Sequence, residues 1–391
     1  MSAFGPRWRL LWLTSSYPRG PQDGTARFVA ELAEAVAKSG ARCRVVTPAR
    51  AGERAGIAWE GGVEVVRFDF PGREGTGSLV GSRGLPTRLR ADPIGFALRL
   101  PPYLAAFATA ARRARFARAP DHVDATVAHW LVPAGGLLAT ALPGAPRPLC
   151  IAHSSDVDLL ARLPGGGALA RALAARMPIG ATSTLLTERL AALGVDALDL
   201  RLGVAVGPAP TTDGRGLCTL SRLVPGKGLE AAIDAAAATP ERALTLLGEG
   251  PALAALRTRA DRRAVRLHAP GAVVGTAKRA ALQAHDMLLF LPEADGGFGA
   301  RDNLPVAVLE ALEAGLGVVC SAVGALPALL GDCPAARVLP TGPDGPAPDA
   351  VAAAVAALRA LPVAERVAAA RVAAAPFAMP AALRRLQRAL A

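Results

Sequence analysis

Two basic residues stand close together in a glycine-containing loop in the second half of the chain. Arg222 and Lys227 follow a short apolar segment, and Gly226 and Gly228 flank the lysine. Two fixed cations just past a strand end can hold a diphosphate and offset the negative charge that grows on it as a bond breaks. Glycine lets the backbone approach such a ligand closely. Leu229 stands where a Walker loop carries Ser or Thr, so we exclude ATP hydrolysis. By themselves the two cations form either a clamp for a leaving diphosphate or a solvated basic loop.

A histidine and an acid stand close together in the first half of the chain. His153 ends a predicted strand and begins the sequence His-Ser-Ser-Asp, which closes with Asp156. An imidazole at a strand end can orient a hydroxyl group or stabilise developing positive charge. His129 ends the preceding predicted strand, so it either lines the same site or is a buried histidine with satisfied hydrogen bonds. The histidines are not placed with acids as a metal triad, so we expect a site without a metal.

Short apolar runs alternate with helical patterns, and the alternation positions these residues. A first series of strands is predicted over 9–14, 43–47, 125–129, 149–153 and 179–182. A second series is predicted over 217–220, 243–247, 265–268, 287–291 and 318–321. Such alternation predicts doubly wound parallel sheets with helices on both faces. Open parallel sheets bind ligands at the carboxyl ends of their strands, where Arg222 and His153 fall.

The length and composition predict a globular protein of two domains. The chain has 391 residues, of which 52% are hydrophobic and 19% charged, and a single core seldom grows to that size. Residues 207–216 read Gly-Pro-Ala-Pro-Thr-Thr-Asp-Gly-Arg-Gly and are typical of a linker. We therefore predict a first domain over 1–206, a linker over 207–216 and a second domain over 217–375. A terminal helix over 376–391 is expected to pack back on the first domain.

The charge distribution favours an anionic partner. The net charge is +12, and residues 1–205 carry 25 basic and 16 acidic side chains. The segment 88–118 combines seven arginines and four aromatic rings with a single acid, Asp92. It either docks on an anionic membrane or packs on the domain as a solvated basic helix, and we expect Pro101 and Pro102 to break it. Scattered cysteines and the lack of a signal-peptide core favour the cytoplasm, at the inner face of the membrane if docking occurs.

An ordered set of motifs resembles a known family along nearly the whole chain. The motifs are Ser16-Tyr-Pro18 through Phe28-Val29, His153-Ser-Ser-Asp156, Leu202-Gly-Val204, Leu220 to Leu229, Leu247-Gly-Glu-Gly-Pro251 and Arg301 to Gly315. In this order they resemble the retaining glycosyltransferases of family 4, also called glycosyl transferases group 1. The resemblance implies the GT-B fold, in which two Rossmann-like domains face a cleft. It also implies that the domain over 1–206 lies on the acceptor side and that the domain over 217–375 binds the nucleotide sugar. It also favours the diphosphate clamp over a solvated basic loop.

The resemblance also implies a role for each matching residue. His153, Arg222, Lys227 and Asp302 would be catalytic, and Glu310 would bind the ribose hydroxyls of the nucleotide. Further donor contacts would come from Gly24, Gly250, Asn303 and Leu304, whereas His129 and Asp156 would lie on the acceptor side. The implied reaction transfers a sugar from a nucleotide sugar to a saccharide or lipid-linked acceptor, with retention of configuration. Neither a cofactor nor nucleic acid is expected.

The chain departs from the family pattern at several positions. Ala205, Asn303, Gly317 and Ala328 replace a common Asp, Gly, Pro and Glu. They leave room for an altered donor or for lost activity. A non-catalytic nucleotide-sugar-binding protein and a sugar-nucleotide epimerase therefore stay open as alternatives. A nicotinamide oxidoreductase is disfavoured, because no Gly-x-Gly-x-x-Gly follows the first strand.

Overall fold

The chain divides into two compact units. The computed structural model describes residues 4–5, 8–20, 23–74, 79, 89, 91–115, 122–210, 214–293, 304–342 and 344–391. Unit 1 comprises Met1–Gly203 together with Met379–Ala391, and unit 2 comprises Val204–Ala378. The chain therefore crosses from one unit to the other twice, and the crossing segments pair through a parallel bridge between Val204 and Ala378.

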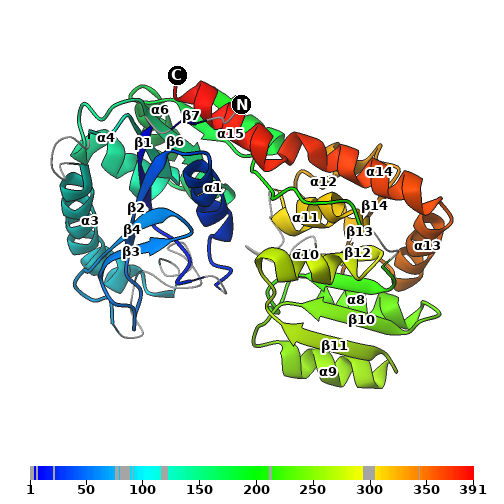
Figure 1. Cartoon of the computed structure of the whole chain (residues 1–391). Coiled ribbons are helices and arrows are strands. Elements are labelled where there is room, and N and C mark those ends of the chain that lie inside the picture. Colours follow the sequence, from blue (N-terminus) through cyan, green and yellow to red (C-terminus); the bar gives the residue numbers. More distant parts are fainter. Residues whose placement is uncertain are drawn as a thin grey trace. The chain divides into compact units, whose positions relative to one another are not determined.

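The described part of unit 1 forms an eight-stranded sheet in the order β3-β4-β2-β1-β5-β6-β7-β8 (Figure 1). The strands are β1 (Arg9–Thr14), β2 (Arg42–Pro48), β3 (Gly56–Glu60), β4 (Val63–Phe68), β5 (Ala125–His129), β6 (Pro148–Ala152), β7 (Ile179–Ala181) and β8 (Ala197–Asp199). The predicted parallel sheet is confirmed, with one correction at its edge. β3 pairs with β4 in the antiparallel sense, because the two strands form a hairpin at Gly61 and Gly62.

Helices cover both faces of this sheet. One face carries α3 (Pro93–Arg115), α4 (Gly136–Ala141), α5 (Ser154–Arg162), α6 (Gly166–Ala174) and α7 (Thr184–Ala192). The other face carries α1 (Arg27–Lys38) and α15 (Met379–Ala389). Alternate residues of β1 divide between the two cores, since Leu11 and Leu13 pack with α3 whereas Trp12 packs with α1. Both faces are buried, as expected for a doubly wound sheet.

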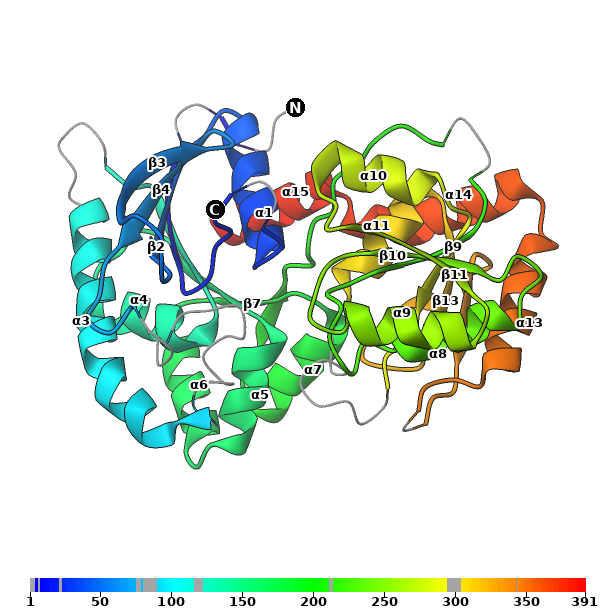
Figure 2. The ribbon, with the colours of Figure 1, turned by 90° about the horizontal axis from the view of Figure 1, so that it is seen from below.

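The described part of unit 2 forms a six-stranded parallel sheet in the order β11-β10-β9-β12-β13-β14. The strands are β9 (Leu217–Leu220), β10 (Ala243–Leu247), β11 (Arg266–Gly271), β12 (Met287–Phe290), β13 (Gly317–Ser321) and β14 (Ala336–Leu339). One face packs against α8 (Leu229–Ala237), α9 (Leu253–Arg262) and α13 (Pro348–Arg359). The other packs against α10 (Gly275–Gln283), α11 (Val306–Ala314), α12 (Leu326–Leu330) and α14 (Val363–Ala374), and Figure 2 shows both layers.

The end of the chain returns to unit 1. Leu383, Leu386 and Leu390 of the C-terminal segment are buried in the core that α1 shares with the sheet. α15 is strongly amphipathic, so its apolar stripe supplies the packing and its arginines stay at the surface. Gly203 makes this packing possible, because a Cβ there would lie 2.9 Å from the Cβ of Ala382.

The long helix α3 corrects the prediction made for its prolines. It runs without interruption through Pro101 and Pro102, although each proline removes a helical hydrogen bond. Tyr103 directly follows the prolines and Phe107 lies about one helical turn further on, and both are fully buried in the core of unit 1. We infer that this packing offsets the cost of the prolines. The rings of Tyr103 and Phe107 therefore face the core of unit 1 and are not available to a membrane, whereas Phe116 lies outside the described residues.

Candidate functional site

In unit 1, the two candidate histidines lie side by side. His129 ends β5 and His153 follows β6, and the two strands pair in parallel. The Nδ1 of His129 lies 3.2 Å from the Nε2 of His153, and the rings stack with an interplanar angle of 14°. Burial lowers the pKa of His129 to about 3, whereas burial and the neighbouring His129 hold the pKa of His153 well below its ordinary value. Both imidazoles are therefore neutral at physiological pH.

Asp156 fixes the backbone around this pair. Its two carboxylate oxygens accept hydrogen bonds from the backbone N–H groups of His153, at 2.9 Å, and Leu131, at 2.5 Å. The carboxylate thus caps the start of α5 and joins it to the loop after β5. Burial raises the pKa of Asp156 to about 7, although these hydrogen bonds oppose the shift. Asp158, two residues further on, pairs with Arg189 at 2.8 Å, so this Asp-x-Asp sequence serves the packing of unit 1.

Aromatic rings surround the histidine pair. The ring centroids of Phe28 and Trp130 lie 5.0 and 4.7 Å from the ring centroid of His153. The ring centroid of Trp12 lies 4.9 Å from that of His129. Trp130 adopts a φ of 72°, an uncommon left-handed conformation for a bulky residue. Such outliers gather at functional sites. His129 and His153 also line a small cavity of about 20 Å³ that extends towards α15.

The loop that carries Gly24 is organised by an acid that the sequence analysis did not single out. Asp23 forms an ion pair with Arg50 and accepts the N–H groups of Arg19 and Thr25, each at 2.9 Å. Burial opposes the ionisation of Asp23, but these bonds outweigh it and hold its pKa below the ordinary range. Gly24 is exposed, and a Cβ on it would meet no atom within 4 Å. Its backbone is therefore accessible to a ligand.

In unit 2, the loops at the carboxyl ends of the strands pack tightly on one another. Gly228 has a φ of 67°, and a Cβ on it would lie 1.6 Å from the carbonyl oxygen of Leu291, just past β12. Gly250 follows β10, and a Cβ there would lie 2.2 Å from the carbonyl oxygen of Leu223. Only glycine fits at either position. The loop between β9 and α8 is thus held between the loops that follow β10 and β12.

This loop carries both predicted cations. Arg222 is exposed and Lys227 is partly exposed, and both follow the carboxyl end of β9. Leu304 is buried just ahead of Pro305, the residue that caps α11. Asp302 and Asn303 lie outside the described residues, and their roles stay predictions. The structure therefore brings the clamp to the edge of the sheet from which α11 begins.

Glu310 has a partner that sequence reasoning missed. It lies on α11, and the Nζ of Lys278 on α10 forms an ion pair with its Oε1. Both side chains are mostly buried, at 14% and 16% exposure. The pairing fixes one carboxylate oxygen of Glu310, and a carboxylate is the kind of group that accepts hydrogen bonds from hydroxyl groups. Lysine is rare in this chain, and that scarcity is the one sequence signal that could have singled out Lys278.

The departures from the family pattern lie in different surroundings. Ala205 and Ala328 are exposed, whereas Gly317 is buried at the start of β13.

Within the described residues, no three His, Cys, Asp or Glu side chains gather as a metal site. Metal independence stays a prediction.

The comparisons with known proteins agree with this arrangement. Residues 214–360 match the family model described as glycosyl transferases group 1. The sucrose-phosphate synthase of Thermosynechococcus elongatus shares the fold with a TM-score of 0.70 at 15% identity, over 98% of each chain. HepE of Anabaena, solved with UDP and glucose, has a TM-score of 0.66 at 15% identity, over 98% of this chain and 99% of HepE. The UDP-forming trehalose-phosphate synthase of Burkholderia vietnamiensis has a TM-score of 0.64 at 15% identity, over 96% of this chain and 98% of the synthase.

No curated protein sequence matches the chain. The family match of residues 214–360 and the fold shared along nearly the whole length nevertheless support a glycosyltransferase with the GT-B fold. The predicted fold and enzyme class are thereby confirmed. The roles of the site residues, the retention of configuration and the nature of the acceptor stay predictions.

Proposed function

We propose that the protein transfers a sugar from a nucleotide sugar to a saccharide or lipid-linked acceptor, with retention of configuration. The observation that carries the proposal is the glycine-packed loop after β9, which holds Arg222 and Lys227 at the strand ends of the unit that matches the family. Structures of the same fold are described with UDP or UDP-glucose bound, which supports a nucleoside diphosphate sugar as donor.

In the proposed reaction, the bond between the anomeric carbon and the diphosphate oxygen breaks while a bond from the acceptor oxygen forms on the same face. The acceptor proton passes to the leaving phosphate. Arg222 and Lys227 stabilise the charge that develops on the diphosphate, and Asp302 binds sugar hydroxyls. His153 is neutral and buried, so a ring nitrogen of its imidazole can donate a hydrogen bond to a sugar hydroxyl or accept one from it. This scheme needs neither a side-chain nucleophile nor a metal.

A panel of nucleotide sugars tests the proposal. A nucleotide sugar that binds the folded state but not the unfolded state raises the melting temperature. The nucleotide sugar that gives the largest rise therefore identifies the base and the sugar of the donor. The donor found is then incubated with saccharide and lipid-linked acceptors, and the product is read by NMR. Transfer with retained anomeric configuration is the expected result. Formation of an epimer of the donor, or saturable binding without any turnover, would favour one of the two alternatives instead.

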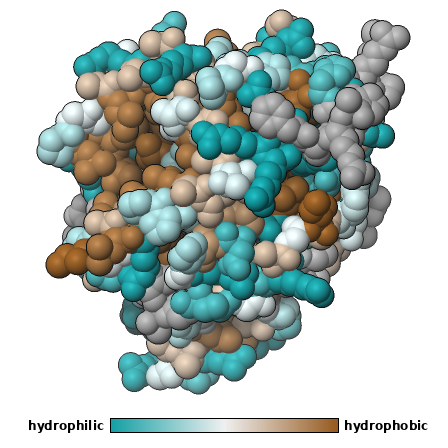
Figure 3. All heavy atoms as spheres, turned by 90° about the vertical axis from the view of Figure 1, so that its left-hand side faces the viewer, coloured by the Kyte–Doolittle hydropathy of each residue, from teal (hydrophilic) through white to brown (hydrophobic). Residues whose placement is uncertain are grey.

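We further propose that the protein acts at the cytoplasmic face of a membrane and docks there through the first half of α3. Among the helices described, α3 alone is long and apolar enough to cross a bilayer by length and composition, but Tyr103, Phe107 and Ala111 of its second half are buried in unit 1. Ile94 and Leu98 lie one turn apart and are 76% and 74% exposed. Figure 3 shows apolar side chains on the face of unit 1 that carries α3. Exposed Arg112 and Arg113 can contact lipid phosphates.

Co-sedimentation with liposomes tests the docking. The wild type is expected to bind anionic vesicles more than neutral ones at low salt, and Ile94→Glu to bind them less. Val372→Glu is the matched control, because Val372 is 73% exposed on α14 of unit 2. Equal binding to both kinds of vesicle, or equal binding by Ile94→Glu and Val372→Glu, would contradict docking through α3 and favour a soluble acceptor.

A further inference from the structure

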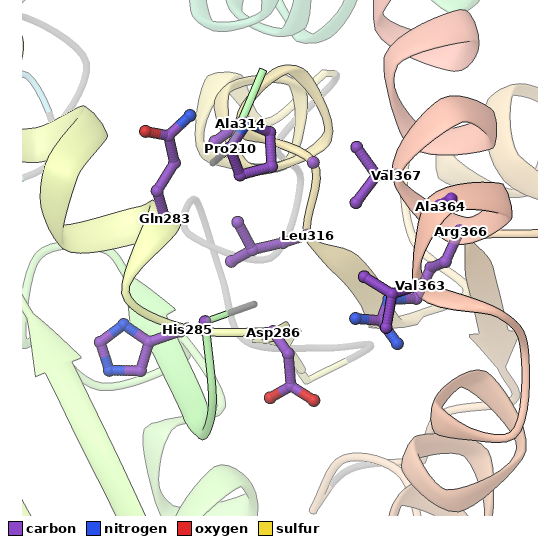
Figure 4. Close-up of a pocket in the computed structure, with 12 residues that line it drawn as sticks. Pro210, Gln283, His285, Asp286, Ala314, Leu316, Val363, Ala364, Arg366 and Val367 are labelled. Carbon is purple, nitrogen blue, oxygen red and sulfur yellow. The ribbon is translucent and has the colours of Figure 1, made fainter. Parts of the chain in front are cut away.

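A second pocket of about 350 Å³ lies within unit 2, at the edge of the sheet where the strands begin (Figure 4). Its walls include Asp286, which precedes β12, and Leu316, which precedes β13. Arg222 and Gly250, by contrast, follow the carboxyl ends of β9 and β10. These two edges of a parallel sheet lie opposite each other. The pocket is therefore separate from the proposed donor site.

α14 brings a buried guanidinium group to this pocket. Arg366 lines the pocket and is 5% exposed, and Figure 4 shows its guanidinium beside Val363, facing the interior. Its Nε has no hydrogen-bond partner, and its Nη1 reaches only the carbonyl oxygen of Leu358, at 3.4 Å. Within the part of the chain that the structure describes, no carboxylate lies within ion-pair distance of it. A buried charge without a counterion is costly, so the position calls for an anion.

The backbone of β13 is shaped to admit this arginine. A Cβ at Gly317 would lie 3.3 Å from the Cδ of Arg366 and 2.6 Å from the Sδ of Met287. Any larger residue would displace one of these side chains. Gly317 is also one of the positions at which the chain departs from the family pattern. The glycine therefore makes room for the stem of the buried arginine.

The other polar groups in the pocket are already bonded. Both oxygens of Asp286 accept from Arg359, at 2.7 and 3.0 Å, so that carboxylate is neutralised. The two ring nitrogens of His285 are bonded to Ala281 and Thr245. Gln283 donates to the carbonyl oxygen of Pro208. Among the described residues that line the pocket, Arg366 is thus the one whose charge is not neutralised by another side chain. A ligand would have to supply the counterion.

The start of α14 adds to the preference for an anion. Val363 and Ala364 are the first residues of this helix and line the pocket, so their N–H groups and the helix dipole favour negative charge. Glu365 follows in the first turn but is exposed. The remaining walls are apolar and comprise Pro210, Ala314, Leu316, Val363, Ala364 and Val367. A cavity about half this size takes up benzene in an apolar core.

We propose that this pocket binds a small carboxylate with a compact apolar body, with Arg366 holding the carboxylate. One cation beside a neutralised acid matches one negative charge, and the planar guanidinium fits a carboxylate in a bidentate manner. The apolar walls account for the body of the ligand. A dianionic phosphate without an apolar part would leave most of the pocket unfilled.

Calorimetric titration of the full chain with 4-phenylbutyrate tests the proposal, and 4-phenylbutyramide serves as the neutral isostere. Saturable binding of the carboxylate is expected, with the amide weaker by roughly tenfold or more. Arg366→Met should lose at least roughly tenfold in affinity while raising the melting temperature, since an uncompensated buried charge is removed. Arg262→Met is the matched control, because Arg262 is exposed on α9.

A second variant covers the case in which Arg366→Met does not fold. Ala364 is exposed at the rim, so Ala364→Trp fills the pocket from outside and should abolish binding. The proposal is overturned if the carboxylate does not bind the wild type, or if the amide binds as tightly. It is also overturned if Arg366→Met or Ala364→Trp binds like the wild type, or if inorganic phosphate competes as well as the carboxylate.

Discussion

The Nδ1 of His129 lies 3.2 Å from the Nε2 of His153, and the two stacked rings are buried at the ends of neighbouring strands. One ring must donate the hydrogen of this bond and the other accept it, so the pair requires at least one neutral acceptor nitrogen. Protonating both rings would break the hydrogen bond and place two like charges side by side. The arrangement is therefore sensitive to acid.

This sensitivity gives a prediction for stability. Burial lowers the pKa of His129 to about 3 from an ordinary value of 6.5, so between these values the unfolded chain binds a proton that the folded chain does not. The free energy of unfolding therefore falls as the pH falls, by about 1.4 kcal/mol per pH unit for each such histidine. Asp156, whose pKa is raised to about 7, acts in the opposite sense, because its contribution to the free energy of unfolding falls as the pH rises.

The variant His129→Gln isolates the histidine contribution, because it keeps a hydrogen-bonding group and leaves Asp156 in place. Its free energy of unfolding should fall less steeply than that of the wild type between pH 6.5 and pH 4. All the tryptophans lie in unit 1, so their fluorescence follows the relevant transition. Exposed His268 provides the control variant His268→Gln. Parallel pH profiles for His129→Gln and the wild type would contradict the prediction.

The fold could largely be predicted from the sequence, because its strands are short apolar runs bounded by turn residues. β1, β5, β9 and β10 begin and end at the predicted residues. The hairpin of β3 and β4 was missed, although Gly61 and Gly62 stand between its strands with the positive φ angles of a tight turn. The local rule for proline failed at Pro101, because the burial of neighbouring rings in the core overrides it.

The candidate site could be predicted only in part. A motif places Arg222 and Lys227 at a strand end, since that follows from the order of elements along the chain. The pairing of Lys278 with Glu310 joins residues 32 positions apart on different helices, and no local pattern indicates it. The pocket at Arg366 depends likewise on a glycine in one element and an arginine in another. Such contacts require the tertiary structure.

A second prediction concerns the role of His153 in the reaction. His153→Ala should lower the turnover number while largely keeping the affinity for the donor, because the imidazole acts on the reacting sugar rather than on the nucleotide. His122, which is exposed, gives the control variant His122→Ala. Turnover and donor affinity are measured separately, by steady-state kinetics and by titration of the donor. Retained turnover in His153→Ala would move the catalytic role elsewhere, with His129 as the next candidate.

A third prediction concerns the ion pair between Lys278 and Glu310. Glu310→Gln and Lys278→Met should each weaken the binding of the free nucleotide, the first by altering the ribose contact and the second by releasing the carboxylate that makes it. The double variant should lose less than the sum of the two, because both changes affect one contact. The measurement is the dissociation constant of the nucleoside diphosphate. Strictly additive losses would show that Lys278 does not position Glu310.

A fourth prediction concerns the packing of the loop after β9. Gly228→Ala should destabilise unit 2 by at least about 2 kcal/mol, because a Cβ would collide with the carbonyl of Leu291 at a positive φ. Gly342→Ala is the control, since a Cβ there meets no atom within 4 Å. Hydrogen exchange of the amides of β9 and β12 reports the loss within unit 2. Equal protection in the two variants would contradict the close approach.

The central claim is that Arg222 and Lys227 stabilise the diphosphate as it leaves a nucleotide sugar. The most direct measurement is the turnover number for sugar transfer by the wild type, Arg222→Ala and Lys227→Ala, with the donor identified from the nucleotide-sugar panel. The wild type should transfer the sugar, and each variant should remain folded but turn over about a hundredfold to a thousandfold more slowly, as when one preorganised donor to a developing anion is removed. Normal turnover in both variants would contradict the claim.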